Sequence, residues 1–231
     1  MVLASNDLAL PTSRALREIQ MKRTTNIAIA MGILGVASLA NAQSLKFTGM
    51  QLNPVNSGTI SVNGGTTTVN MGALTFDTGS STIVTYCADA TAALNLNSNP
   101  YSQSIVNFSG GTGMSLAAKI LATGFGSATT ADQQAGLQLA IWDAIYDNGS
   151  SFGAGSGNFS VVSGVSSNVL NYASSYFTAG KNSTPTNQVE LFSATGAGGQ
   201  SQLHVVPEPA ALAVLGLGVF GFIRRRRTSS K

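Results

Sequence analysis

Residues 130–147 read TADQQAGLQLAIWDAIYD, and this stretch predicts the clearest helix of the chain. Thr130 is a suitable N-cap, and Gln133 completes a Thr-x-x-Gln capping box. Apolar residues then recur at helical spacing, which predicts one buried face made of Leu137, Ala140, Ile141, Ala144 and Ile145. The pattern stops at Asp147-Asn148-Gly149, because asparagine and glycine favour turns. The predicted helix therefore has a defined start, a buried face and a defined end.

Strand patterns dominate the chain before this helix and return after it. Upstream, β-branched and aromatic residues form short runs, and Asn63-Gly64-Gly65 suits a hairpin turn between two of them. The predicted strands cover residues 45–47, 59–62, 66–71, 74–76, 82–87, 188–194 and 200–206, and two more helices cover 115–121 and 165–177. Strands, then helices, then strands predict an α+β domain, with an antiparallel sheet or sandwich and an inserted helical segment.

The two ends of the chain have the composition of targeting segments. From Met21 to Ala42 the sequence is basic, then apolar, then rich in small residues, which predicts a signal peptide over residues 21–42. Residues 1–20 are then upstream sequence from a misassigned start, or a long basic region of the signal. We expect a single α+β domain over residues 43–204 and a sorting tail over residues 205–231.

The positive charge of the chain lies outside the predicted domain. The 231 residues have a formal net charge of +3. Residues 43–206 hold three lysines and six carboxylates, so their formal charge is −3. A nucleic-acid partner is not expected, because a surface that binds phosphates needs clustered positive charge.

The tail combines three features in a fixed order. Prolines hold its start extended, an uncharged run over residues 210–223 forms a short transmembrane segment, and an arginine block stays on the cytoplasmic side. This order resembles the PEP-CTERM sorting signal of exported bacterial proteins, and the residues that carry the resemblance are Val206, Pro207, Glu208, Pro209, Arg224, Arg225, Arg226 and Arg227. A single-span tail anchor is the alternative.

The resemblance to PEP-CTERM proteins implies a route through the cell envelope. Exosortase would recognise the tail and remove it, after transient anchoring in the inner membrane. The expected destination is the cell surface or extracellular matrix of a Gram-negative bacterium that makes exopolysaccharide.

The chain has one cysteine, Cys87, at the end of the strand predicted over residues 82–87. An intramolecular disulfide is therefore excluded, and a free thiol in an exported protein needs an explanation. Cys87 is a buried apolar residue, half of an intermolecular disulfide, a nucleophile, or a thiol bonded in another way. A hydrolase would need a base beside it, and the one histidine, His204, lies next to the tail. One cysteine and one histidine do not supply an ordinary zinc site, so neither a metal nor a cofactor is expected.

Two short motifs, 51 residues apart, suggest a role for Cys87. The first is Tyr86-Cys87-Ala88-Asp89, and the second is Gln138-Leu139-Ala140-Ile141-Trp142. Together they resemble the thioester domains of bacterial surface adhesins. The resemblance implies that the Cys87 thiol attacks the Gln138 amide, expels ammonia and leaves an internal thioester, which later acylates an amine or hydroxyl group. The surroundings of that bond would be Tyr86, Asp89, Ile141 and Trp142.

The helix pattern alone leaves the role of Gln138 open. Gln138 lies one turn before Ile141 and Trp142, so it borders the apolar stripe. A shielded amide there needs either a hydrogen-bond partner or a covalent one. Asp143 and Asp147, one turn apart on the same helix, are expected on a solvated face and not as an acid–base pair.

Two functions remain. The first is an exported surface or matrix protein whose thioester attaches it to surface amine or hydroxyl groups or to an extracellular polysaccharide. Such a domain reacts once, so we do not expect an enzyme. The second is a structural component of an exopolysaccharide or biofilm matrix that keeps the fold without the chemistry.

Overall fold

The computed structural model describes residues 42–206, except residues 98, 148, 150, 151, 154, 156, 197 and 198. All of these belong to one of the two compact units of the chain, Ala40–Lys231, and the other unit, Met1–Leu39, lies outside the described residues. Residues 21–41 of the signal peptide predicted over 21–42, and the tail from Pro207 onwards, also lie outside them, whereas Ala42 is the first residue of β1. Among the described residues, no helix has both the length and the apolar character needed to cross a membrane.

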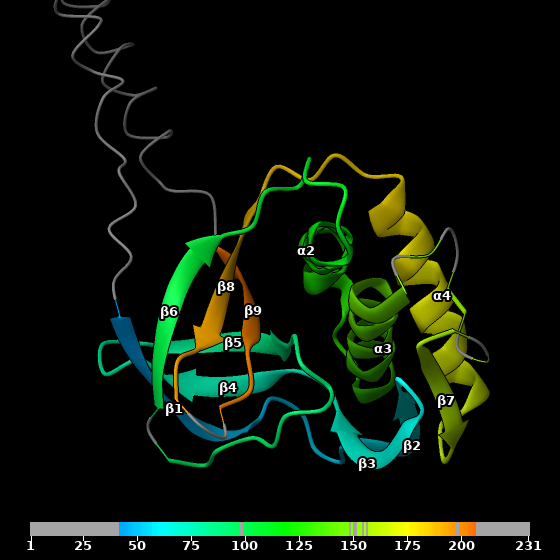
Figure 1. Ribbon diagram of the computed structural model, residues 1–231, viewed down its shortest axis with the longest axis horizontal. Helices are drawn as coiled ribbons and strands as arrows, with labels where there is room; N and C mark the ends of the chain where they lie inside the picture. Colours follow the sequence, from blue (N-terminus) through cyan, green and yellow to red (C-terminus); the bar gives the residue numbers. More distant parts are fainter. Residues whose placement is uncertain are drawn as a thin grey trace, which may run out of the picture. The chain divides into compact units, whose positions relative to one another are not determined.

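Six strands form a closed antiparallel barrel in the order β1-β4-β5-β9-β8-β6 (Figure 1). Their bounds are β1 Ala42–Met50, β4 Leu74–Asp77, β5 Thr82–Cys87, β6 Asn99–Ile105, β8 Gln188–Ala194 and β9 Gln202–Val206. Every neighbouring pair is antiparallel, and β5 pairs with β4 on one side and β9 on the other. Closure brings the last strand of the domain next to the strand that ends at Cys87.

A second antiparallel sheet has the order β3-β2-β7. Its strands are β2 Asn56–Val62, β3 Gly65–Met71 and β7 Phe159–Ser163. The predicted hairpin between β2 and β3 is confirmed, since Asn63 and Gly64 have positive φ values of 51° and 82° at the tip. Positive φ at both central residues is the requirement of a type I′ turn, which explains asparagine followed by glycine.

Three helices pack on one another, and α2 and α3 lie between the barrel and α4 (Figure 1). They are α2 Gly113–Gly124, α3 Ala131–Asp147 and α4 Ser167–Lys181, with a short 3-10 turn, η1 Phe125–Ser127, after α2. The predicted capping box of α3 is confirmed. The Thr130 backbone N–H donates to Gln133 Oε1 at 3.0 Å, and the Gln133 N–H donates to Thr130 Oγ1 at 3.3 Å.

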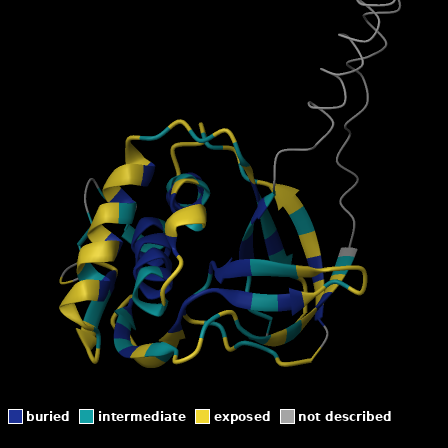
Figure 2. Cartoon of the chain, turned by 180° about the vertical axis from the view of Figure 1, so that it is seen from behind, coloured by how far each residue is buried: buried dark blue, intermediate teal, exposed yellow. Residues whose placement is uncertain are grey.

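Helix α3 is buried on all sides from Gln134 to Ala144, whereas α4 exposes its outer face (Figure 2). Each pair of helices meets at a glycine, where a side chain would collide with the neighbouring helix. Gly136 of α3 lies against α4, Gly180 of α4 against Ile120 of α2, and Gly113 of α2 against Ala144 and Ile145 of α3. These close approaches keep α3 tightly enclosed by its neighbours.

The α+β class with antiparallel sheets and inserted helices is confirmed by this architecture. Two strands were not predicted, β6 and β7, and the predicted sheet or sandwich takes the form of a closed barrel plus a three-stranded sheet. Strand β6 contains Pro100 and has only Asn99 and Tyr101 buried, so its pattern lacks the apolar alternation of a typical strand.

Candidate functional site

Cys87 and Gln138 lie side by side at the junction of the barrel and α3. The Cys87 backbone N–H donates to Gln138 Oε1 at 2.9 Å, and Gln138 Nε2 donates to the Cys87 carbonyl oxygen at 2.9 Å. The carboxamide therefore pairs with the backbone N–H and C=O of Cys87, as a residue of a neighbouring strand would. The side chains of Cys87 and Gln138 are 4% and 1% exposed, so the pair is shielded from bulk water.

Strand β9 of the barrel fixes the position of Cys87 from one side. Thr85, Tyr86 and Cys87 pair with His204, Leu203 and Gln202 of β9. The pairing continues one residue further, because the Ala88 N–H donates to the Ser201 carbonyl at 2.8 Å. The end of β5 is thus held rigidly where the middle of α3 passes it.

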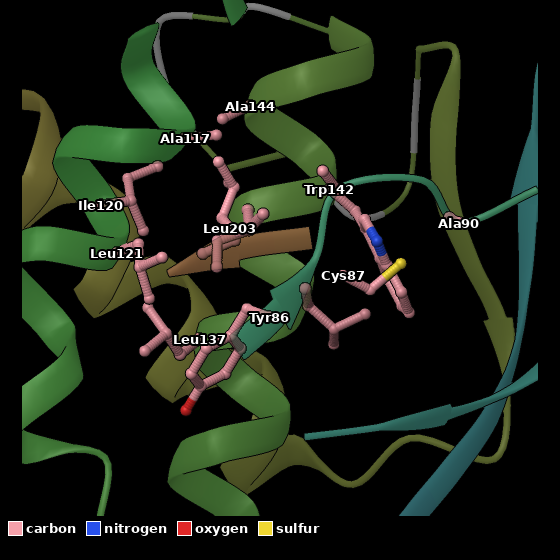
Figure 3. Close-up of a cluster of buried hydrophobic side chains, with 14 of the residues drawn as sticks. Tyr86, Cys87, Ala90, Ala117, Ile120, Leu121, Leu137, Trp142, Ala144 and Leu203 are labelled. Carbon is pink, nitrogen blue, oxygen red and sulfur yellow. The ribbon is translucent and has the colours of Figure 1, made fainter. Parts of the chain in front are cut away.

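The Cys87 sulfur is held against the chain that follows it. The thiol donates to the Asp89 carbonyl oxygen at 2.9 Å, and the Asp89 N–H donates to the sulfur at 3.2 Å. Burial raises the pKa of Cys87 well above its usual range, and this effect outweighs the opposing effects of the Asp89 backbone and the Trp142 side chain. The Trp142 indole faces the sulfur (Figure 3), but its N–H makes no hydrogen bond with standard geometry. The unreacted residue is a neutral thiol.

Asp89 organises the loop after Cys87. Its Oδ1 accepts hydrogen bonds from Thr91 N at 2.9 Å, Thr91 Oγ1 at 2.8 Å, Ala92 N at 3.1 Å and Tyr146 Oη at 3.2 Å. Burial favours a higher pKa for Asp89, but these hydrogen bonds outweigh it and leave the pKa below its usual value. The Asp89 carboxylate therefore holds the turn that follows Cys87.

A chain of amides supports this loop from the barrel side. Gln200 Nε2 donates to the carbonyl oxygens of Asp89 and Ala92, both at 3.0 Å. Gln202 Nε2 donates to the Gln200 carbonyl at 3.1 Å, and Gln202 Oε1 accepts from Thr85 Oγ1 at 3.0 Å. The loop is thereby attached to β9 as well as to α3.

A pocket of about 700 Å³ opens beside the Cys87–Gln138 pair. Cys87, Gln138 and Trp142 line it together with residues of β1, of β3 and of the loop at 90–96. None of the residues that line it carries a charge. A small molecule or a side chain that enters this pocket reaches the pair without crossing the core.

The other residues predicted for the thioester surroundings and the sorting motif lie in different parts of the structure. Trp142 lines the pocket together with Cys87. Ile141 is fully buried in the core, and it does not line the pocket. Tyr86 is buried on the opposite face of β5, beside Leu121 and Leu137 (Figure 3). Val206 is the last residue of β9, and the remaining sorting residues, 207–209 and 224–227, lie outside the described residues.

Sequence reasoning missed Tyr146 and Gln200. Tyr146 Oη accepts from Ala90 N at 3.1 Å and donates to Asp89, so it holds the start of the turn. A signal for Tyr146 was present, since Gln138, Trp142 and Tyr146 are four residues apart and share one helix face. Gln200 had no such signal, because its contact depends on barrel closure.

The prediction for Asp143 was wrong. Asp143 is fully buried, not solvated, and its Oδ1 accepts from the Gly153 N–H at 3.1 Å. Burial, and to a smaller extent the charge of Asp147, raise the pKa of Asp143 to about 6, while the Gly153 bond opposes them. Asp147 is half-buried and accepts from the backbone of Asn158 and Phe159. The helix stripe could not reveal this burial, because α3 is enclosed on all sides.

The side chain of His204, the one histidine of the sequence, contacts Val84 and Phe192. His204 Nδ1 is 2.8 Å from the Val84 carbonyl oxygen, and its ring packs against Phe192. Among the described residues there is no group of three or more His, Cys, Asp or Glu side chains that could hold a metal ion.

Comparison with known proteins identifies the tail. Residues 205–227 match the PEP-CTERM protein-sorting motif. The chain therefore carries a C-terminal sorting signal of exported proteins, and this signal implies processing by exosortase. No curated protein matches the sequence.

The structure is similar to several thioester domains of surface proteins. The N-terminal thioester domain of a surface protein from Clostridium perfringens has 15% identity and a TM-score of 0.41, over 58% of this chain and 89% of that one. The corresponding domain of fibronectin-binding protein SfbI from Streptococcus pyogenes has 11% identity and a TM-score of 0.39, over 69% and 99%. The N-terminal domain of the S. pyogenes pilus tip adhesin Cpa has 13% identity and a TM-score of 0.40, over 71% and 99%.

Proposed function

We propose that this exported protein forms an internal thioester between Cys87 and Gln138 and uses it to attach covalently to an extracellular partner. The acceptor is an amine or hydroxyl group on the surface of a cell or on an exopolysaccharide-associated matrix. The observation that carries the proposal is the pair of hydrogen bonds between the Gln138 carboxamide and the backbone N–H and C=O of Cys87, in a buried place beside a pocket.

The hydrogen bonds between Gln138 and Cys87 favour thioester formation as well as holding the two residues together. During attack by the thiol on Gln138 Cδ, negative charge develops on Oε1, and the Cys87 N–H already donates to that atom. A carbon–sulfur bond forms, the carbon–nitrogen bond breaks, and the thiol proton leaves with the nitrogen as ammonia. Burial of both residues keeps water from hydrolysing the product.

The domain acts once, because transfer of the acyl group to a partner consumes the thioester. It is therefore a chemical anchor and not a turnover enzyme. Exosortase processing of the tail would deliver it from the inner membrane to the surface of a Gram-negative cell or to its biofilm matrix.

A structural matrix role without chemistry is the second candidate, and one observation favours it. The Gln138 amide and the Cys87 peptide already satisfy one another, and the sulfur is hydrogen-bonded to Asp89. An unreacted pair would thus be a stable structural contact. The two candidates differ in the covalent state of Cys87.

The test is the intact mass of residues 43–206 beside its Cys87→Ala variant. A blocking residue must precede Gln43, because an N-terminal glutamine also cyclises with loss of ammonia. We expect the native protein to be lighter by one ammonia than its composition requires, the variant to have its full mass, and methylamine to restore a Cys87 thiol. A native protein of unmodified mass, with a thiol that labels on unfolding, would instead favour the structural role.

A further inference from the structure

Strand β3 forms one wall of the pocket beside Cys87 and Gln138. Four consecutive residues of this strand line the pocket, Thr67, Thr68, Val69 and Asn70. Successive side chains of a strand point to opposite faces of the sheet, so a surface that lies on one face meets every second residue. A pocket that meets four in a row lies along the edge of the strand.

This edge has no neighbour among the described strands. In the order β3-β2-β7, strand β3 pairs with β2 alone. The hairpin closes with Val62 opposite Gly65 across a two-residue turn, and such a closing pair is hydrogen-bonded. Hydrogen-bonded and open pairs then alternate, so the peptide groups of Thr66, Thr68 and Asn70 point away from β2.

The edge also lacks the features that usually protect an exposed strand. Natural sheets protect their edges with proline, charged residues or bulges. Strand β3 reads GTTTVNM, with neither proline nor charge, and it pairs with β2 without a shift in register. Thr66, Thr67, Thr68 and Asn70 are all exposed.

We propose that an extended polypeptide segment of the partner pairs with the free edge of β3 and so brings its acceptor side chain to the Cys87–Gln138 bond. This inference rests on the proposed thioester and names the class of partner as a protein segment. Peptide groups in the added strand would complete the hydrogen bonds of Thr66, Thr68 and Asn70. An uncharged pocket suits an uncharged backbone, and Leu96, which is 63% exposed at the pocket, offers an apolar contact to the added strand.

Docking on this edge positions the transfer step. The amine or hydroxyl group of the docked segment attacks Gln138 Cδ, a bond forms from the carbon to that nitrogen or oxygen, and the carbon–sulfur bond breaks. The proton of the nucleophile passes to the departing sulfur, which leaves Cys87 as a thiol. Holding the nucleophile at the bond converts a bimolecular reaction into an effectively intramolecular one.

The experiment compares two peptide probes on the mature protein purified from the cells that export it. The first is an acetylated octapeptide of alternating threonine and valine with one central lysine. The second has the same side chains, but every backbone nitrogen is methylated, so that neither of its edges can pair with β3. Covalent adducts are followed by intact mass, and each rate is divided by the rate with methylamine, which needs no docking. We expect the first peptide to react about tenfold faster than the second, because two or three hydrogen bonds distinguish them.

A backbone variant tests the same edge from the protein side. Thr68→Pro removes one of the outward N–H groups, and proline is tolerated at an edge position that does not pair. Thr68→Ala removes the side chain and keeps the N–H. We expect the relative rate with the first peptide to fall severalfold in Thr68→Pro and to stay within about twofold of wild type in Thr68→Ala.

The outcomes separate this inference from the thioester proposal. If methylamine forms no adduct with wild-type protein, the thioester itself is absent. If methylamine reacts but both peptides react at the same relative rate, docking on β3 is wrong. A neutral oligosaccharide such as maltoheptaose that forms adducts faster than the first peptide would overturn the inference in favour of a glycan partner.

Discussion

Gln138 serves the folded chain through both ends of its carboxamide. Its oxygen and nitrogen each hold one backbone group of Cys87, and all four atoms are buried away from solvent. A buried peptide group without a partner costs stability, so glutamine at this position stabilises the fold whether or not it forms a thioester. Glutamine at position 138 therefore suits both the proposed thioester chemistry and the stability of the fold.

The structural role of Gln138 is measurable once the chemistry is removed. In a Cys87→Ala background, we expect Gln138→Ala to lower the free energy of unfolding by about 2–5 kcal/mol, since it leaves two buried backbone groups unpaired and opens a cavity. Urea denaturation measures the change. Gln188→Ala, at an exposed position, is the control and should change it by less than about 0.5 kcal/mol. Equal effects of the two substitutions would contradict this role.

Asp143 is the residue whose protonation should affect stability. Its pKa is raised to about 6 in the folded state, above the ~3.9 of an unfolded aspartate. Below both values the carboxyl is protonated in both states. As the pH rises, the unfolded state releases its proton first, so stability is lost between about pH 4 and 6. We expect Asp143→Asn to remove this loss, which urea denaturation at pH 4 and pH 7 would detect.

For Asp143→Asn, the quantity to compare at each pH is the difference in free energy of unfolding between the variant and the wild type. The variant should gain stability relative to wild type as the pH rises from 4 to 7. A constant difference over that range would mean that Asp143 titrates at its ordinary value despite its burial.

The contact between Cys87 and Gln138 could be anticipated from the sequence, whereas the surroundings of the pair could not, and the thioester itself stays a prediction. Cys87 and Gln138 come together as the two motifs indicated, because each lies in a strongly patterned element, β5 or α3. The burial of Asp143 was missed because the prediction assumed a helix with one solvated face. Gln200 was missed because its partners, Asp89 and Ala92, are more than 100 residues away in the chain.

At the scale of elements, glycine sets how closely the three helices approach. A side chain at Gly136 would lie 2.6 Å from Tyr172 Cβ and 3.0 Å from the backbone of Val169 and Ala173, so α4 would have to move. Since α3 carries Gln138 and Trp142, a displaced α3 would also disturb the site. The small residues of α3 are therefore part of what positions the candidate thioester.

This packing gives a matched pair of substitutions. We expect Gly136→Ala to lower the free energy of unfolding by about 1–3 kcal/mol, because the added methyl group meets the backbone of α4. Gly126→Ala, in η1, has no atom within 4 Å of the added carbon and should be neutral or slightly stabilising. Both are measured by urea denaturation in the Cys87→Ala background. A loss of equal size at both positions would point to backbone conformation instead of close packing.

The elements themselves were predicted unequally, for a physical reason. The hairpin at Asn63-Gly64, the capping box at Thr130 and the strand ending at Cys87 depend on neighbouring residues, so local patterns reveal them. Strand β6 depends on β1 and β8, which are distant in sequence, and its own residues are mostly polar. Pairing with β1 and β8 in the closed barrel therefore makes these residues a strand, although their sequence lacks the usual strand pattern.

At the scale of the whole molecule, the sorting signal and the folded domain overlap in β9. The sorting motif begins at residue 205, and β9 continues to Val206.

Replacing Pro207-Glu208-Pro209 with alanines should leave unprocessed protein in the inner membrane, because exosortase would lose its recognition sequence. Cell fractionation with immunoblotting would show this accumulation. Normal surface display of the variant would contradict the sorting role of the motif.

The overlap between the last strand and the sorting motif also constrains the finished product. Val205 and Val206 pair with Val189 and Gln188 of β8, and β9 is the strand that pairs with β5 and so supports Cys87. A protease that cut before Val205 would remove the last two of the five residues of β9, together with their pairing to β8. Because Val205 and Val206 belong to a paired strand, we expect the mature chain to end no earlier than Val206.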